Sequence, residues 1–244
     1  MSAVAGAGFL SAASSSYTAV IFDFEGTLVD FQWRLSPAEE ELRGAFSTLG
    51  FDGDAFSTGN YAAMWNAAAD LWAPRGRLTE LREALGPIYD RWDADALTRW
   101  VPRPGAADLL AQFGAAGMRA GLVSNIGRKA LSGALNRLHF TGLWPPIVSR
   151  DDVTWMKPRA EGILRVIKDW QLAPEKVLFV GDSLADVRGA RAAGISVAII
   201  RDGECDEAAF ANDPPDHMIS SLGELSAIVS AEPGTGMRLP VKSV

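Results

Sequence analysis

The sequence predicts an α/β fold: a Rossmann-like parallel sheet with helices on both faces, and an all-helical insertion after the first strand. Short apolar, β-branched runs alternate with longer segments of helical periodicity, which is typical of βαβ units and a parallel sheet. The stretch 31–102 breaks this alternation, because it has no convincing strand and is rich in Ala, Leu and Trp. We therefore expect one sheet domain that is interrupted by a helical segment.

The strands and helices of the sheet domain are placed by apolar runs and by periodicity. Five strands and a short sixth are expected at Ala19–Phe24, Arg119–Ser124, Pro146–Ser149, Lys176–Gly181, Ser196–Arg201 and His217–Ser220. Helices are expected between most of them, at Ala106–Ala116, Arg128–Leu138, Ala160–Trp170 and Ala185–Ala193. Strands separated by helices in this way must run parallel, with helices covering both faces of the sheet.

The insertion is expected to contain four helices. The first begins at Ser36, with Pro37 in its first turn and Glu39 completing a capping box, and ends near Gly50. The others are expected at Phe56–Trp72, Arg77–Leu85 and Pro87–Trp100. The resulting domain prediction is a disordered leader at 1–16, a core domain at 17–30 and 103–230, a helical cap at 31–102 and a loose tail at 231–244.

Composition narrows the classes of function. The chain has 244 residues, 48% of them hydrophobic and 22% charged, as in ordinary globular proteins. The formal net charge of −7 disfavours a nucleic-acid or anionic-membrane binder, and the sequence has no apolar run of membrane-spanning length. Cys205 is the only cysteine, so an intrachain disulfide is impossible and a cytoplasmic location is expected.

Polar residues gather where the expected strands end, which is where an open α/β sheet binds ligands. Asp23-Phe24-Glu25-Gly26-Thr27 follows the first strand, and Ser124-Asn125 ends the second. Lys157-Pro158 follows the third, and Gly181-Asp182-Ser183-Leu184-Ala185-Asp186 ends the fourth. An acid at the end of so apolar a strand as the first needs a partner, so Asp23 is the strongest catalytic candidate.

In these four motifs and their order the chain resembles the haloacid dehalogenase-like superfamily, from about Tyr17 to Val229. The helical insertion resembles the C1-type cap of phosphoglycolate phosphatases and β-phosphoglucomutases. The resemblance implies that Asp23 attacks phosphorus and forms an aspartyl-phosphate, and that Glu25 is the acid and base of the two half-reactions. It also implies that Lys157 neutralises charge shared by Asp23 and the phosphoryl group.

The same resemblance implies a phosphate site and a metal site. Thr27 and Ser124 would donate their hydroxyls to phosphate oxygens, together with the backbone N–H of Asn125. Mg²⁺ would be held by Asp23, Asp182 and the backbone carbonyl of Glu25, with Asp186 orienting Lys157 or reaching the metal through water. The expected partner is a small phosphorylated metabolite.

Glu25 departs from the family pattern, because an Asp normally occupies that position. The extra methylene moves the carboxylate by roughly 1.5 Å. The leading interpretation is a Mg²⁺-dependent phosphatase of small organic monoesters. Two alternatives stay open: a phosphoglucomutase-like phosphotransferase and a non-catalytic module that binds a metabolite or protein. Within the cap, Trp33 and Arg34 are the best candidates for contact with substrate, because they lie where the chain enters it.

Overall fold

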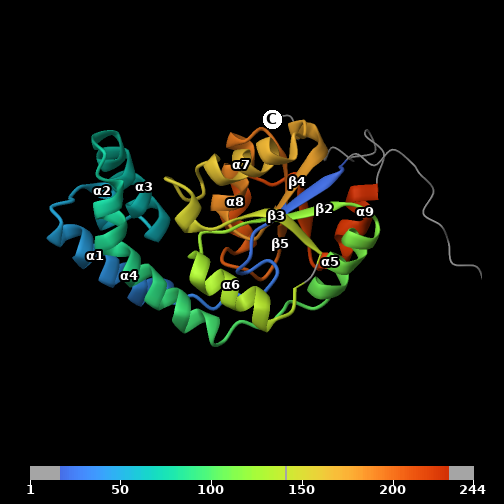
Figure 1. The fold of residues 1–244 in the computed structure, drawn as a ribbon, viewed down its shortest axis with the longest axis horizontal. Coiled ribbons are helices and arrows are strands. Elements are labelled where there is room, and N and C mark those ends of the chain that lie inside the picture. Colours follow the sequence, from blue (N-terminus) through green and yellow to red (C-terminus); the bar gives the residue numbers. More distant parts are fainter. Residues whose placement is uncertain (1–16, 141, 231–244) are drawn as a thin grey trace, which may run out of the picture.

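The computed structural model describes residues 17–140 and 142–230, which form a parallel sheet with a helical lobe beside it (Figure 1). The six strands are β1 (Ala19–Phe22), β2 (Arg119–Val123), β3 (Leu143–Val148), β4 (Val177–Gly181), β5 (Ser196–Ile200) and β6 (His217–Ile219). Their order across the sheet is β3-β2-β1-β4-β5-β6, and every pairing is parallel. The predicted fold class is confirmed.

Helices cover both faces of the sheet, as the alternating strands and helices predict. These helices are α5 (Ala106–Ala115), α6 (Arg128–Arg137), α7 (Glu161–Trp170), α8 (Leu184–Ala192) and α9 (Leu225–Ser230). Alternate residues of β1 point to opposite faces: Ile21 joins a cluster with Ile163 of α7, whereas Phe22 joins one with Leu110 of α5. Because both faces of the sheet are buried, the sequences of these strands are continuous apolar runs.

The helical lobe lies between β1 and α5 in the chain and contains α1 (Leu35–Thr48), α2 (Asp54–Ser57), α3 (Tyr61–Trp72) and α4 (Leu78–Leu97). Figure 1 shows these four helices to one side of the sheet, which is the position of a cap. Their apolar residues form one cluster with one face of the sheet domain. The exact domain boundaries stay a prediction.

Three details of the predicted cap helices are wrong. Helix α1 begins at Leu35 with Arg34 as its N-cap, so Ser36 lies inside the helix and makes no capping box. The segment expected as one helix from Phe56 is two, because Asn60 starts α3 by accepting a hydrogen bond from the N–H of Ala63. Conversely, α4 runs through Pro87 without a break. Tertiary packing of α4 against α1 and α6 outweighs the single lost backbone hydrogen bond.

The strand predictions differ from the structure mainly at β3, which starts at Leu143 instead of Pro146. This strand lies at the edge of the sheet, where proline is tolerated. The expected leader at 1–16 and tail at 231–244 lie outside the described residues. In the part of the chain that the structure describes, none of the helices has the length and apolarity needed to cross a membrane.

Candidate active site

Asp23 lies directly beyond β1, at the carboxyl edge of the sheet. Its N–H donates to the carbonyl of Val180 at 2.8 Å, which fixes its backbone to β4. Its carboxylate Oδ1 lies 2.7 Å from Nζ of Lys157, and the same ammonium lies 2.7 Å from Oδ1 of Asp186. Burial alone would lower the pKa of Lys157, but the two carboxylates together raise it above its usual value. Lys157 is therefore a buried cation shared by two acids.

Asp186 is held by the start of α8. Ser183 caps this helix, and Oδ2 of Asp186 accepts hydrogen bonds from the Ser183 N–H at 3.1 Å, the Ser183 hydroxyl at 2.8 Å and the Asp182 N–H at 3.1 Å. The other oxygen pairs with Lys157. Because both oxygens already have donors, the structure shows Asp186 as an anchor for Lys157.

The Asp182 carboxylate lies beside that of Asp23, and two hydrogen-bond donors orient it. Its Oδ1 accepts the Thr27 hydroxyl at 3.1 Å, and its Oδ2 accepts the Glu204 N–H at 2.6 Å. Gly26, at φ +77°, passes so close that an added Cβ would lie 2.0 Å from this carboxylate. Both the positive φ and the lack of space for a Cβ therefore require a glycine at position 26. Thr27 is fully buried in this contact, and its predicted contact with phosphate stays a prediction.

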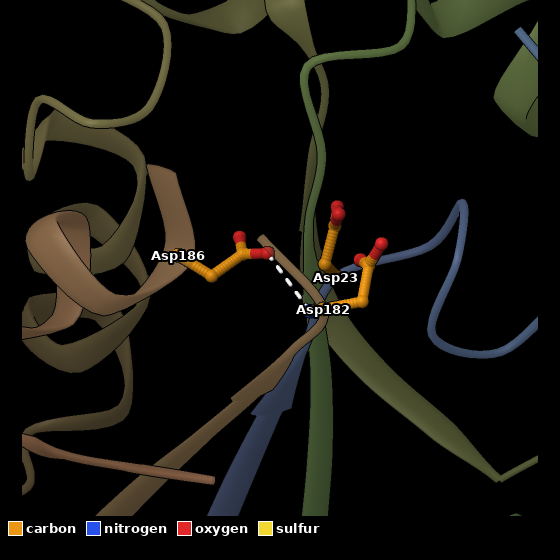
Figure 2. A group of neighbouring side chains, drawn as sticks. All are labelled: Asp23, Asp182 and Asp186. Atoms are coloured by element: carbon orange, nitrogen blue, oxygen red, sulfur yellow. Dashed lines mark hydrogen bonds between the residues drawn. The ribbon is translucent and has the colours of Figure 1, made fainter. Parts of the chain in front are cut away.

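These three aspartates offer a group of oxygen ligands that suits a hard divalent cation. One carboxylate oxygen from each of Asp23, Asp182 and Asp186 lies within 4.8 Å of the others. Figure 2 shows the Asp23 and Asp182 carboxylates side by side beyond the strand ends, with Asp186 turned toward them. Burial and repulsion between these acids raise the pKa of Asp182 well above its usual value. Oxygen donors and excess negative charge are what Mg²⁺ requires, so the residues present fit the metal.

A cavity lies at Asp23, and we call it the Asp23 cavity. The residues that line it include Asp23, Glu25, Ser124, Asn125, Lys157 and Glu204. Ser124 is buried, and its hydroxyl accepts the Ile126 N–H at 3.3 Å. The Asn125 side chain accepts the Lys157 N–H at 2.9 Å and donates to the Lys157 carbonyl at 3.2 Å. Asn125 thereby fixes the loop that carries Lys157.

Glu25 is tied to both chain segments that join the cap to the sheet domain. Its Oε1 accepts hydrogen bonds from the N–H groups of Gln32 at 2.8 Å and Trp33 at 2.7 Å, and from the Trp100 indole at 2.7 Å. Gln32 and Trp33 lie where the chain enters the cap, and Trp100 lies where it leaves. Burial raises the pKa of Glu25 to about 8, although these hydrogen bonds act in the opposite direction.

A second cavity adjoins the first, and we call it the aromatic cavity. Its walls include Phe31, Trp33, Tyr61, Tyr89, Asp93 and Arg150. The two cavities share Glu25, Phe31, Tyr61, Asn125 and Ile126. Trp33 lines the aromatic cavity, and its contact with substrate stays a prediction. Arg34 does not line either cavity: its side chain is 59% exposed and lies 3.5 Å from Asp95.

Several residues that line these cavities were not identified from the sequence, among them Tyr61, Asp93, Arg150 and Glu204. Tyr61 and Asp93 lie on cap helices and gave no signal that separates them from ordinary helix residues. Glu204 follows β5, and Arg150 comes directly after Ser149 at the end of β3. The strand-end position of Arg150 is the signal that could have found it.

The order of the motifs and this geometry agree with comparison to known proteins. Residues 17–194 match the haloacid dehalogenase-like hydrolase family. This match covers most of the chain, so the protein belongs to that family and is an enzyme of the hydrolase class.

Curated relatives and solved structures add detail. The chain is 29% identical over 227 residues to phosphoglycolate phosphatases of Salmonella choleraesuis and Shigella flexneri, and each match covers 84% of this chain and 90% of the relative. A solved haloacid dehalogenase-like hydrolase from Bacteroides fragilis is similar with a TM-score of 0.62 and 26% identity. That match covers 86% of this chain and 99% of the other.

Proposed function

We propose that this protein is a Mg²⁺-dependent phosphatase that hydrolyses a small organic phosphate monoester through an aspartyl-phosphate on Asp23. The observation that carries the proposal is the chain of close contacts from Asp23 to Lys157 to Asp186, with Asp182 beside it, at the carboxyl edge of the sheet. The names of the phosphoglycolate phosphatase relatives support the same reaction class.

In the first half-reaction, Asp23 attacks phosphorus and the bond to the leaving oxygen breaks. Lys157 lies against Asp23 and neutralises charge on the transferring group, and Asp186 holds it in place. Ser124 and the N–H of Asn125 contact the phosphoryl oxygens from the cavity wall. Glu25 gives a proton to the leaving oxygen. The raised pKa of Glu25 leaves it protonated near neutral pH, as this step requires.

In the second half-reaction, Glu25 takes a proton from a water molecule that attacks the aspartyl-phosphate, which restores Asp23 and releases phosphate. Asp23, Asp182 and the backbone carbonyl of Glu25 would hold Mg²⁺. When it is bound, the metal supplies charge stabilisation to the phosphoryl oxygens. Thr27 keeps Asp182 oriented through its hydroxyl. The partner is a small phosphorylated metabolite, and the single cysteine supports a cytoplasmic location.

The test is phosphate release by the purified full chain from a panel of phosphate esters, in Mg²⁺ and in chelator. We expect turnover in Mg²⁺ alone. Mass spectrometry of rapidly quenched enzyme should find a phosphoryl group on the peptide that contains Asp23. Transfer of the phosphoryl group to a sugar hydroxyl instead of water would favour the phosphotransferase alternative. No turnover of any ester, with correct folding, would contradict the proposal and favour a non-catalytic module.

A further inference from the structure

The aromatic cavity is placed to receive the organic part of the substrate. It shares Glu25, Tyr61 and Asn125 with the Asp23 cavity, so the two cavities adjoin at these side chains. A phosphoryl group beside Asp23 would present its leaving oxygen toward Glu25. The rest of the molecule then extends past Glu25 into the aromatic cavity.

Arg150 is the one cation among the described residues that line the aromatic cavity, and acids already surround it. Its Nη1 lies 2.7 Å from Oδ2 of Asp93, its Nη2 pairs with Asp90, and its Nε lies 3.8 Å from Asp151. Nη1 also lies 3.4 Å from the Asn125 carbonyl. The Arg150 side chain is 3% exposed and that of Asp93 is 2% exposed. Every guanidinium nitrogen therefore has an acidic partner.

Asp93 cannot easily release Arg150, because other groups hold it in place. Its Oδ2 also accepts the Gly127 N–H at 2.9 Å, and its Oδ1 accepts the Trp33 indole at 3.1 Å. A substrate carboxylate placed here would meet Asp93 and would find Arg150 already paired with acidic side chains. Like charges that are brought together in a buried site without a compensating cation disfavour binding.

The remaining walls suit an uncharged group. The rings of Trp33 and Tyr61 lie 4.8 Å apart between centroids, and Tyr89 is buried in the same wall. Aromatic faces with a few fixed polar groups are typical of pockets for neutral organic ligands. A phosphoester with a neutral alkyl, aryl or hydroxylated group would bury apolar surface here without desolvating a charge.

Resting on the proposed function, we propose that this enzyme prefers phosphate monoesters with an uncharged organic group and discriminates against those with a carboxylate, including phosphoglycolate. The arrangement of Arg150 between Asp93 and Asp90 carries the inference. The chain then differs in substrate from the phosphoglycolate phosphatases to which it is 29% identical.

The test compares two substrates that differ mainly in this charge. With the full chain in Mg²⁺, kcat/KM for 2-hydroxyethyl phosphate should exceed that for 2-phosphoglycolate by about tenfold or more. 2-Phenylethyl phosphate should also show a lower KM than ethyl phosphate, whose alcohol is a similar leaving group. Equal or better turnover of phosphoglycolate would overturn the inference and leave the proposed function intact. No turnover of any ester would overturn both.

A variant pair tests whether the paired state of Arg150 sets this preference. The Asp90 side chain is 53% exposed and lines neither cavity, so Asp90→Asn should remove one partner of Arg150 without disturbing the fold. We expect the kcat/KM ratio of phosphoglycolate to 2-hydroxyethyl phosphate to rise severalfold. Asp52→Asn removes the same charge from an exposed cap loop and should leave the ratio unchanged. An unchanged ratio in Asp90→Asn would overturn the role assigned to Arg150.

Discussion

The two ends of the active site are built differently. At the Asp23 end, the charged groups follow the sheet strands and pair with one another at 2.7 Å through Lys157. At the Glu25 end, the hydrogen bonds come from the two segments that connect the cap. At the first end the sheet holds the Asp23 backbone, and Asn66 of cap helix α3 exchanges hydrogen bonds of 2.8 and 3.0 Å with Met156, next to Lys157. The second end depends on the segments where the chain enters and leaves the cap.

This difference separates two tasks of the enzyme. Asp23 and Asp182 are held by backbone groups of the sheet domain, so these two carboxylates are positioned without a hydrogen bond from the cap. Glu25 reaches the cap connections with its longer side chain, so the position of the proton donor is coupled to the cap. Substitutions at the two ends should therefore have different kinetic effects.

The largest effect is expected for Asp23→Asn, because an amide cannot act as the nucleophile. We expect kcat to fall by more than about 10³-fold with unchanged circular dichroism. Asp108→Asn, on the exposed face of α5, is the matched control and should keep full activity. Activity of Asp23→Asn within about tenfold of the parent enzyme would remove Asp23 from the role of nucleophile.

The next largest effect is expected at the other end, for Glu25→Gln. Turnover of alkyl phosphates should fall by about 10²-fold or more, because their leaving oxygen needs a proton. Formation of the aspartyl-phosphate from aryl phosphates should change little, since phenolates leave without help. Its breakdown still needs a base, so stopped-flow measurement should show a burst of phenol. Equal losses on both substrate types, with no burst, would mean that Glu25 is structural.

Asp182→Ala should weaken the binding of Mg²⁺ more than it lowers the rate of the chemical step. We expect the Mg²⁺ concentration for half-maximal rate to rise by about 10- to 100-fold, in line with losses seen when metal sites are disturbed. A Mg²⁺ titration of phosphate release measures this shift. Ca²⁺ should inhibit the parent enzyme, because its looser coordination would misplace Asp23. Full activity of the parent enzyme in chelator would contradict the assignment.

The contrast between the two ends also explains which parts of the site could be predicted from the sequence. Asp23, Lys157 and Asp182 each follow an apolar strand, and strands of a parallel sheet end at one edge, so their proximity was predictable. The contact between Glu25 and Trp100 joins positions 75 residues apart, with the whole cap between them in the chain, and no local pattern encodes that packing. The continuity of α4 through Pro87 was missed for the same reason, since its neighbours override its local preference.

The smallest effect is expected for a substitution that loosens the link between Glu25 and the cap. Trp100→Phe removes the indole N–H that lies 2.7 Å from Oε1 of Glu25 and retains a ring against Phe24, where the centroids are 5.2 Å apart. Losing one hydrogen bond to a buried carboxyl group costs about 1–2 kcal/mol, so kcat/KM for alkyl phosphates should fall by about 5- to 30-fold.

Trp92→Phe is the matched control for Trp100→Phe, because the Trp92 indole also donates to a glutamate, Glu41, at 2.9 Å. Glu41 lies on α1 within the cap and does not line either cavity, so this variant should keep its kcat/KM even if its thermal stability falls. If Trp100 controls the position of the proton donor, Trp100→Phe should lower kcat/KM for alkyl phosphates more than Trp92→Phe does. With aryl phosphates, Trp100→Phe should leave kcat/KM unchanged. Equal kinetic losses in the two variants would show that the cap tryptophans act on stability alone, and that the Glu25 end of the site works without its link to the cap.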